Sequence, residues 1–271
     1  MSHLNVKILK VKIRSTIESI LKSIVKSLLG RFYTYKIRYF FNKDKNQFYD
    51  SLTDLVMERV LADDAICVDV GCHEGAILDV MLAHAPAGKF YAFEPLPHLF
   101  AHLLGRYGKR AEINLYNLAL SNAAGSTSFN HVISNPGYSG FIKRRYDRPV
   151  EEDTQITVNT ALLDSLVDPG DAVNFIKIDV EGAELQVLQG ARQLIKKHKP
   201  VIVFEHGLGA ADIYGTTPTD IYELLCVECG LQISLMDRWL KNKPALTLDE
   251  FNRQFSQGLD YYFIAYAGTA D

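Results

Sequence analysis

The sequence lacks any long uninterrupted apolar segment. None of its 271 residues belongs to an apolar run of about 18 residues, so we expect no transmembrane helix. Lysines interrupt the N-terminal region throughout, so the compact apolar core of a secretory signal peptide is also missing. These absences predict a cytoplasmic protein, whose association with a membrane would be peripheral, on its inner face.

Cysteine is scarce, with four residues in the whole chain. Cys226 and Cys229 form a Cys-x-x-Cys pair, but the second pair that a four-thiolate zinc site needs is absent. Cys67 falls in a predicted strand, and the pair falls in a predicted helix. We therefore expect free, mostly buried thiols, which are typical of a reducing compartment.

The small net charge of −3 is unevenly distributed along the chain. Residues 1–45 hold eleven Lys and Arg but only two acids, Glu18 and Asp44, so the remaining residues carry −12. An acidic body argues against a nucleic-acid partner, whereas the basic end is suited to an anionic surface. The sequence thus predicts two parts, a basic helical extension over 1–45 and a main domain over 46–271.

Apolar residues recur at spacings of three and four between Val6 and Leu29, with lysines and an arginine on the other faces. This periodicity predicts an amphipathic helix. Residues 1–30 would then lie on anionic lipid, or pack on their own domain or across a homo-oligomer, and the pattern does not separate these alternatives.

Strand-like and helix-like segments alternate along the main domain, which predicts an α/β fold with a doubly wound, mostly parallel sheet. Residues 121–159 interrupt the alternation, and so long a connection is usually functional or disordered. The predicted strands are 65–70, 89–93, 113–118, 173–178, 200–204, 231–235 and 260–266. The predicted helices are 46–61, 75–84, 97–107, 160–167, 183–197, 217–229 and 248–256.

Three predicted strands end in acidic residues. The run Phe175–Glu184 reads strand, acids, glycine, helix; Ala65–Gly75 has the same order; and Phe90–Pro95 ends in Glu94. Enzymes with parallel sheets place their working groups at the carboxyl ends of the strands. These runs therefore predict one site at a shared edge of the sheet.

Together these runs resemble the FkbM family of S-adenosylmethionine-dependent methyltransferases. The resemblance covers Ala65 to Phe204, extends more weakly to Tyr266, and is most specific in the block Lys177–Glu184. It implies a class I (Rossmann-like) methyltransferase fold of seven strands, in which the last strand is antiparallel. It also implies S-adenosylmethionine as the cofactor.

A glycine turn after the first predicted strand would hold the cofactor. Gly71 and Gly75 lack a Cβ, which lets the backbone approach a ligand and turn into the helix. Asp69 would face the methionine ammonium. His73 stands where the family usually carries Asn, and an imidazole can still donate or accept a hydrogen bond.

The nucleoside would lie beyond this turn. Glu94, at the end of the second strand, would accept hydrogen bonds from both ribose hydroxyls, as in other nucleotide-binding folds. By resemblance, Asn117 and Ala119 would lie at the adenine edge.

The chemistry is expected where the fourth and fifth strands end. Methyl transfer to an alcohol requires the loss of the hydroxyl proton, to a general base or with the help of a metal. His206, Asp179 or Glu181 would be the base, and Lys177 would be a functional residue of the buried strand. Alternatively Asp179, Glu205 and His206 would bind a divalent cation.

The segment 134–148 is rich in tyrosine and arginine, which suit an acceptor that carries phosphate or sugar. The alternative is a solvated, flexible loop. The residues concerned are Tyr138, Arg144, Arg145, Tyr146 and Arg148.

We expect an O-methyltransferase that acts on a sugar hydroxyl of a glycan, nucleotide-sugar or lipid-linked saccharide. An NAD(P)-dependent oxidoreductase is a rival, but the Gly-x-Gly-x-x-Gly of dinucleotide-binding folds is absent. A non-catalytic, membrane-associated binding module of the same fold is a second rival. The intact Asp69, Glu94, Asp179 and Glu181 argue against it.

Overall fold

The computed structural model describes residues 45–146 and 150–268. The predictions for residues 1–44 and for Arg148 therefore lie outside the described residues. The chain divides into two compact units, Met1–Val56 and Met57–Asp271, and the boundary falls inside helix α3 (Lys45–Val60). The division at residues 1–45 and 46–271 stays a prediction.

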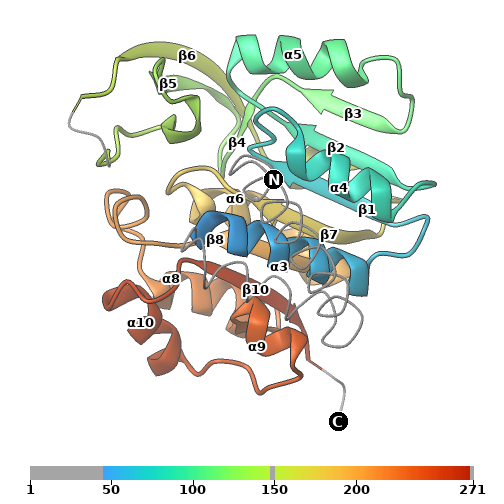
Figure 1. Cartoon of the computed structure of the whole chain (residues 1–271), viewed down its shortest axis with the longest axis vertical. Coiled ribbons are helices and arrows are strands. Elements are labelled where there is room, and N and C mark those ends of the chain that lie inside the picture. The colour runs from blue at the N-terminus through green and yellow to red at the C-terminus, as the bar shows by residue number, and fades with distance from the viewer. Residues whose placement is uncertain (1–44, 147–149, 269–271) are drawn as a thin grey trace, which may run out of the picture. The chain divides into compact units, whose positions relative to one another are not determined.

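A seven-stranded sheet forms the centre of the second unit, with the strand order β3-β2-β1-β7-β8-β10-β9 (Figure 1). β10 is antiparallel to both of its neighbours, and the other pairs are parallel. This topology confirms the predicted class I methyltransferase fold with an antiparallel last strand. The strands are β1 (Ile66–Val70), β2 (Lys89–Phe93), β3 (Ile113–Tyr116), β7 (Val173–Ile178), β8 (Val201–Glu205), β9 (Leu231–Ser234) and β10 (Tyr262–Ala267).

The central strands are buried on both faces, which is why they read as nearly continuous apolar runs. Val68, Ile176 and Phe204, from three neighbouring strands, are completely buried. Because β2, β1, β7 and β8 are adjacent and parallel, their carboxyl ends meet at one edge of the sheet. This edge carries the acidic residues singled out in the sequence.

Local signals set the ends of several helices. A proline at the first position begins α5 (Pro97–Tyr107), and capping boxes at Thr217 and Thr247 begin α8 (Pro218–Tyr222) and α10 (Leu248–Ser256). The helix predicted over 183–197 is broken at Ala191 into two helices. The helix predicted over 217–229 consists of α8 followed directly by a π-helical segment, Glu223–Glu228. The helices are α4 (Ala76–His84), α5 (Pro97–Tyr107), α6 (Glu184–Gly190), α7 (Arg192–His198), α8 (Pro218–Tyr222), α9 (Met236–Leu240) and α10 (Leu248–Ser256).

The interruption at 121–159 contains a second, three-stranded sheet, β4-β6-β5 (Figure 1). Its strands are β4 (Ala119–Leu120), β5 (Gly125–Val132) and β6 (Asp153–Ala161). The helix predicted over 160–167 is wrong, because β6 runs to Ala161 and only a 3₁₀ turn follows at Leu163–Ser165. The β-branched residues of β6 favour an extended strand.

All four cysteines are free, and Cys67, Cys72 and Cys229 are buried. This agrees with the expectation of unpaired thiols. Among the described residues, no helix is both long and apolar enough to cross a membrane.

Candidate active site

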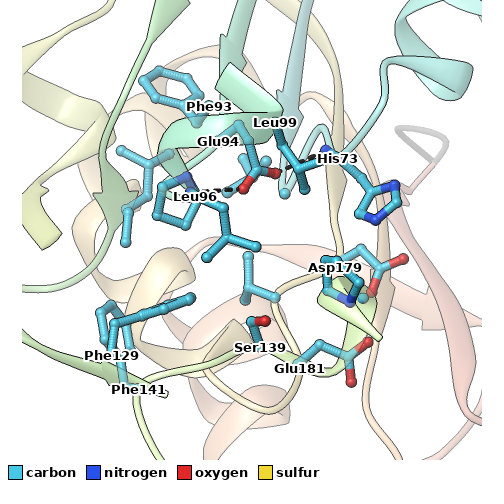
Figure 2. A pocket seen from close by; sticks show the side chains of 18 of the residues that line it. His73, Phe93, Glu94, Leu96, Leu99, Phe129, Ser139, Phe141, Asp179 and Glu181 are labelled. Atoms are coloured by element: carbon cyan, nitrogen blue, oxygen red, sulfur yellow. Dashed lines mark hydrogen bonds between the residues drawn. The ribbon is translucent and has the colours of Figure 1, made fainter. Parts of the chain in front are cut away.

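A cavity of about 260 Å³ opens at the carboxyl edge of β1, β2 and β7. Figure 2 shows Asp179 and Glu181 on one side of this cavity and Phe129 and Phe141 on the other. The small sheet and the turn that follows β5 supply the second side. The lining residues include Val70, Gly71, His73, Phe93, Glu94, Leu96, Leu99, Leu118, Ala119, Phe129, Asn135, Ser139, Phe141, Asp179, Val180 and Glu181.

Glu94 extends from the end of β2 into the cavity (Figure 2). Its Oε1 accepts the backbone N–H of Leu96 at 2.9 Å, and its Oε2 accepts that of His73 at 2.9 Å. Burial raises the pKa of this carboxyl group to about 7, against the lowering effect of the two N–H donors. The two oxygens are therefore held in fixed positions and keep lone pairs for a further donor.

The two glycines of the first turn have different surroundings. At Gly71, φ is +80°, and an added Cβ would lie 1.9 Å from the backbone oxygen of Asp179. At Gly75, φ is +86°, and an added Cβ would lie 2.8 Å from the hydroxyl oxygen of Tyr107. Gly71 lines the cavity, whereas Gly75 lets α5 pack against the turn.

Asp69 is buried in β1 next to the cavity-lining Val70. Burial raises its pKa to about 6, although the charge of Lys177 and a hydrogen bond from Cys72 act in the opposite direction. Its Oδ2 has no hydrogen-bond partner among the described residues. An unpartnered buried carboxylate oxygen is costly, and a cationic ligand group would satisfy it.

Asn117 and Ala119 follow β3. The Asn117 side chain donates to the backbone oxygens of Glu94 at 2.9 Å and Pro95 at 3.1 Å. It therefore braces the end of β2 and does not line the cavity. Ala119 is part of the cavity wall.

Three carboxylates gather where β7 and β8 end. Asp179, Glu181 and Glu205 each offer an oxygen, and these oxygens lie within 4.8 Å of one another. The Lys177 Nζ lies 3.1 Å from Asp179 Oδ2, and the Tyr262 hydroxyl donates to the same oxygen. One cation and one hydroxyl donor therefore engage the same oxygen of Asp179.

The pKa values of the neighbouring Asp179 and Glu205 carboxyl groups are shifted in opposite directions. Burial, together with the neighbouring Asp179 and Glu184 charges, raises the pKa of Glu205 well above its usual value. Burial opposes ionisation of Asp179 as well, but Lys177 and hydrogen bonds from Tyr262 and Glu205 hold the pKa of Asp179 below its usual value. These surroundings favour the ionised form of Asp179 and the protonated form of Glu205.

Glu181 is held in an uncommon backbone conformation. Its φ is +60°, and it forms an ion pair with Arg144, whose side chain is 12% exposed. A positive φ in a residue other than glycine costs roughly 1–3 kcal/mol, so the surrounding contacts must hold Glu181 in this conformation. The carboxylate lines the cavity next to Asp179.

His206 does not line the cavity. Its ring is completely buried and packs on Phe255 at 4.7 Å and Phe251 at 5.7 Å between ring centroids, both from α10. Neither ring nitrogen has a hydrogen-bond partner among residues 45–146 and 150–268. Burial lowers the pKa of His206 to about 4, so the ring is neutral.

This environment makes protein stability depend on His206 at acidic pH. The folded-state pKa lies below the ordinary value of 6.5, so the unfolded chain binds the proton first. Stability contributed by neutral His206 is therefore present above pH 6.5 and is lost as the pH falls toward 4, by at most about 1.4 kcal/mol per pH unit. We expect the free energy of unfolding to fall more between pH 7 and 5 in the wild type than in His206→Gln, as urea denaturation would measure. Equal pH slopes would contradict the buried neutral ring.

The tyrosines and arginines of 134–148 contact one another. The rings of Tyr138 and Tyr146 stack at 6.1 Å, and the Arg144 guanidinium lies 4.8 Å from the Tyr138 ring. Arg145 forms an ion pair with Asp212 at 3.2 Å and is largely exposed. None of these four side chains lines the cavity, and their role toward an acceptor stays a prediction.

Sequence reasoning missed the apolar side of the cavity and Tyr262. The apolar side comes from the small sheet and from α5, where Leu96, Leu99, Phe129 and Phe141 cluster with Ala119. Alternation of Ile156 and Val158 with polar residues in β6 was the available signal for this sheet. Nothing in the sequence singles out Tyr262 from the other tyrosines.

The model of the "Methyltransferase FkbM domain" family matches residues 69–233, more than half of the chain. The hexuronic acid methyltransferase AglP of Haloferax volcanii is 30% identical over 175 residues, which cover 63% of this chain and 65% of that protein. The 2-O-methyltransferase NoeI of Sinorhizobium fredii is 26% identical over 147 residues, which cover 49% of this chain and 60% of that protein.

A crystal structure of methyltransferase FkbM from Methylobacillus flagellatus aligns with 90% of this chain and 60% of its own, at 17% identity and a TM-score of 0.48. The chain spans somewhat less than two thirds of the length of the two curated relatives. The family match runs from the end of β1 into β9 and so includes the cavity and the acidic cluster. The chain therefore belongs to the FkbM family of methyltransferases.

Proposed function

We propose that the protein transfers the methyl group of S-adenosylmethionine to a sugar hydroxyl. One observation carries the proposal: the cavity joins Glu94, fixed by two backbone donors, to the carboxylates Asp179 and Glu181. The first feature suits a nucleoside, and the second suits an acceptor hydroxyl that must lose a proton. Family membership supports the same reaction.

The residues present fit the cofactor. Glu94 would accept the ribose hydroxyls, and Asp69, with its unpartnered Oδ2, would compensate the methionine ammonium. Gly71 permits close approach of the backbone, while His73 and Ala119 line the cavity. When bound, the cofactor supplies an already activated methyl group, so the task of the protein is alignment and exclusion of water.

We assign Asp179 as the proton acceptor. Positive charge builds on the acceptor oxygen as the new C–O bond forms, and its O–H proton becomes strongly acidic. A carboxylate is then basic enough, provided that it is ionised and within reach. Asp179 is kept ionised by Lys177 and lines the cavity. As the C–O bond forms and the C–S bond of the methyl donor breaks, Asp179 would take up the proton that the acceptor hydroxyl loses.

A divalent cation is the weaker alternative. Asp179, Glu181 and Glu205 would be its ligands, an all-oxygen set suited to magnesium or calcium, and His206 would not take part. However, Lys177 already pairs with Asp179, and Arg144 already pairs with Glu181. We therefore propose a reaction that needs no metal, in which Lys177 and Arg144 supply the positive charge that balances the carboxylates of Asp179 and Glu181.

The acceptor is proposed to be a glycan, a nucleotide-sugar or a lipid-linked saccharide. Two relatives support this choice, one described as a hexuronic acid methyltransferase and the other as a 2-O-methyltransferase. Arg144, Arg145, Tyr138 and Tyr146 lie on the segment that leads from the small sheet past Glu181, which suits a role beside the acceptor.

Two measurements test the function. Calorimetry should show micromolar binding of S-adenosylhomocysteine and none of NAD⁺, because no dinucleotide-binding glycine motif is present. Labelled S-adenosylmethionine should then transfer its methyl to some members of a panel of p-nitrophenyl glycosides, with uronides included. Transfer should survive dialysis against EDTA. Tighter binding of NAD⁺ than of S-adenosylhomocysteine would overturn the proposal.

Cofactor affinity should depend on pH through Glu94. Its raised pKa of about 7 means that the free protein protonates this group below neutral pH, and a protonated carboxyl is a poorer acceptor for two hydroxyls. The Kd of S-adenosylhomocysteine should rise about 10-fold between pH 8 and pH 6. The matched variant Glu94→Gln should bind more weakly and lose most of this pH dependence. A wild-type Kd that stays constant over this range would remove Glu94 from the site.

Residues 1–30 lie outside the described residues, and we propose from their sequence that they bind anionic lipid. The full chain should co-sediment with phosphatidylserine vesicles at low salt and detach at high salt, because its lysines are attracted to the lipid charge. A chain lacking residues 1–30 should stay in solution and still bind S-adenosylhomocysteine. Identical behaviour of the two chains would favour packing on protein, including a homo-oligomer, which light scattering would detect.

A further inference from the structure

Tyr262 lies at the start of β10, the antiparallel strand that enters the sheet between β8 and β9. In the strand register it pairs with Glu205, the last residue of β8. The chain thus brings a residue near its C-terminal end to the edge where β7 and β8 deliver their carboxylates. Tyr262 lies outside the matched family domain, which ends at residue 233.

The Tyr262 side chain is tied to the acidic cluster by several contacts. Its hydroxyl donates to Asp179 Oδ2, the oxygen that the Lys177 Nζ approaches to 3.1 Å. The same Nζ lies 3.4 Å from the Tyr262 hydroxyl oxygen and 4.6 Å from the centroid of its ring. Lys177, Tyr262 and Asp179 therefore form a closed triangle of contacts.

The triangle fixes one oxygen of the cavity-lining carboxylate. An aspartate side chain rotates about two bonds, and one point charge such as an ammonium group restrains that rotation weakly because it has no preferred direction. A hydroxyl donor that is itself held by the strand pairing adds direction. With Oδ2 engaged by two donors, the carboxylate has a defined orientation toward the cavity.

We propose that Tyr262 is a positioning residue that orients the Asp179 carboxylate toward the acceptor hydroxyl. The inference rests on the proposed role of Asp179 as proton acceptor. Catalytic groups must be held within about 0.5 Å of the productive geometry, and their supporting contacts provide that precision. The phenol hydroxyl supplies such a contact, which phenylalanine of the same shape would not.

The test removes this hydroxyl alone, by Tyr262→Phe. We expect kcat for methyl transfer to p-nitrophenyl glycosides to fall on the order of 10²-fold, the usual effect of a misplaced catalytic group. The Kd of S-adenosylhomocysteine should be unchanged. The matched control is Tyr266→Phe on the same strand, whose ring packs on Trp239, and it should keep the wild-type kcat.

Two further measurements separate positioning from packing. In the Asp179→Asn background, Tyr262→Phe should have no additional effect, because the group that it orients is already gone. A crystal structure of Tyr262→Phe with S-adenosylhomocysteine should show the Asp179 carboxylate rotated from its present position. An unmoved Asp179, or a full additional loss in the double variant, would overturn the proposal whichever acceptor is used.

The outcome also distinguishes this inference from the proposed function. A wild-type protein that binds no S-adenosylhomocysteine would defeat the function itself. A wild type that transfers methyl groups, together with a Tyr262→Phe variant of equal kcat, would defeat only the role of Tyr262.

Discussion

Replacing Asp179 by asparagine should lower the rate of methyl transfer by about 10²-fold or more while cofactor affinity stays nearly unchanged. Asparagine keeps the size of the side chain and can still accept from Tyr262 and Lys177, but it cannot take up the hydroxyl proton. The residues that we propose to hold the cofactor are different ones, at the ends of β1 and β2. Single-turnover kinetics and calorimetry with S-adenosylhomocysteine would measure the two quantities.

The control for this variant is Asp249→Asn, an exposed aspartate in the first turn of α10. It should leave both quantities at their wild-type values. If Asp179→Asn retained its activity and Glu181→Gln lost it, the proton acceptor would be Glu181, the other carboxylate that lines the cavity.

Replacing Gly71 by alanine should weaken S-adenosylhomocysteine binding by about 10²-fold or more. The new Cβ would lie 1.9 Å from the backbone oxygen of Asp179, so β1 and β7 would have to move apart at the cavity. The positive φ of +80° adds strain for any residue with a side chain. Because Gly71 and Asp179 both line the cavity, their separation would displace the cofactor contacts, and a 10²-fold loss of affinity corresponds to roughly 3 kcal/mol of binding free energy.

Gly105→Ala, in α5, is the matched control, because an added Cβ there meets nothing within 4 Å. This variant should bind the cofactor normally and be slightly more stable, since alanine favours a helix over glycine. Thermal melting of both variants would show whether Gly71→Ala remains folded. Wild-type affinity in a folded Gly71→Ala protein would contradict the contact geometry.

The central sheet was predictable because its strands are buried on both faces and separated by amphipathic helices. The small sheet left a weaker signal, because only β6 alternates and β5 carries just two apolar residues, Phe129 and Val132, among polar ones. Strands of this kind are stabilised by pairing with a distant partner, here β6, and such pairing leaves little trace in the local sequence.

The positions of the acidic residues at the strand ends predicted that they share one edge of the sheet. They did not predict which of these side chains reach the cavity. Glu205 and His206 are neighbours on an extended chain, so their side chains leave on opposite faces. Glu205 joins the acidic cluster, and His206 packs against α10, which is more than 40 residues away in sequence. The alternation of side chains along the strand indicates that only one of Glu205 and His206 reaches the site. Tertiary packing decides which of the two it is.

The segment 121–161, which contains β5 and β6 of the small sheet, begins and ends at neighbouring points. The backbone N–H of Ser121 donates to the backbone oxygen of Ala161 at 2.9 Å. The described residues between them, including β5 and β6, lie outside the central sheet. Such a segment can be exchanged for another of different length without changing the register of the seven central strands. Phe129, Ser139 and Phe141 lie within it. On the proposed function, we expect chimaeras joined at residues 121 and 161 to change which acceptor is methylated while the central sheet is kept.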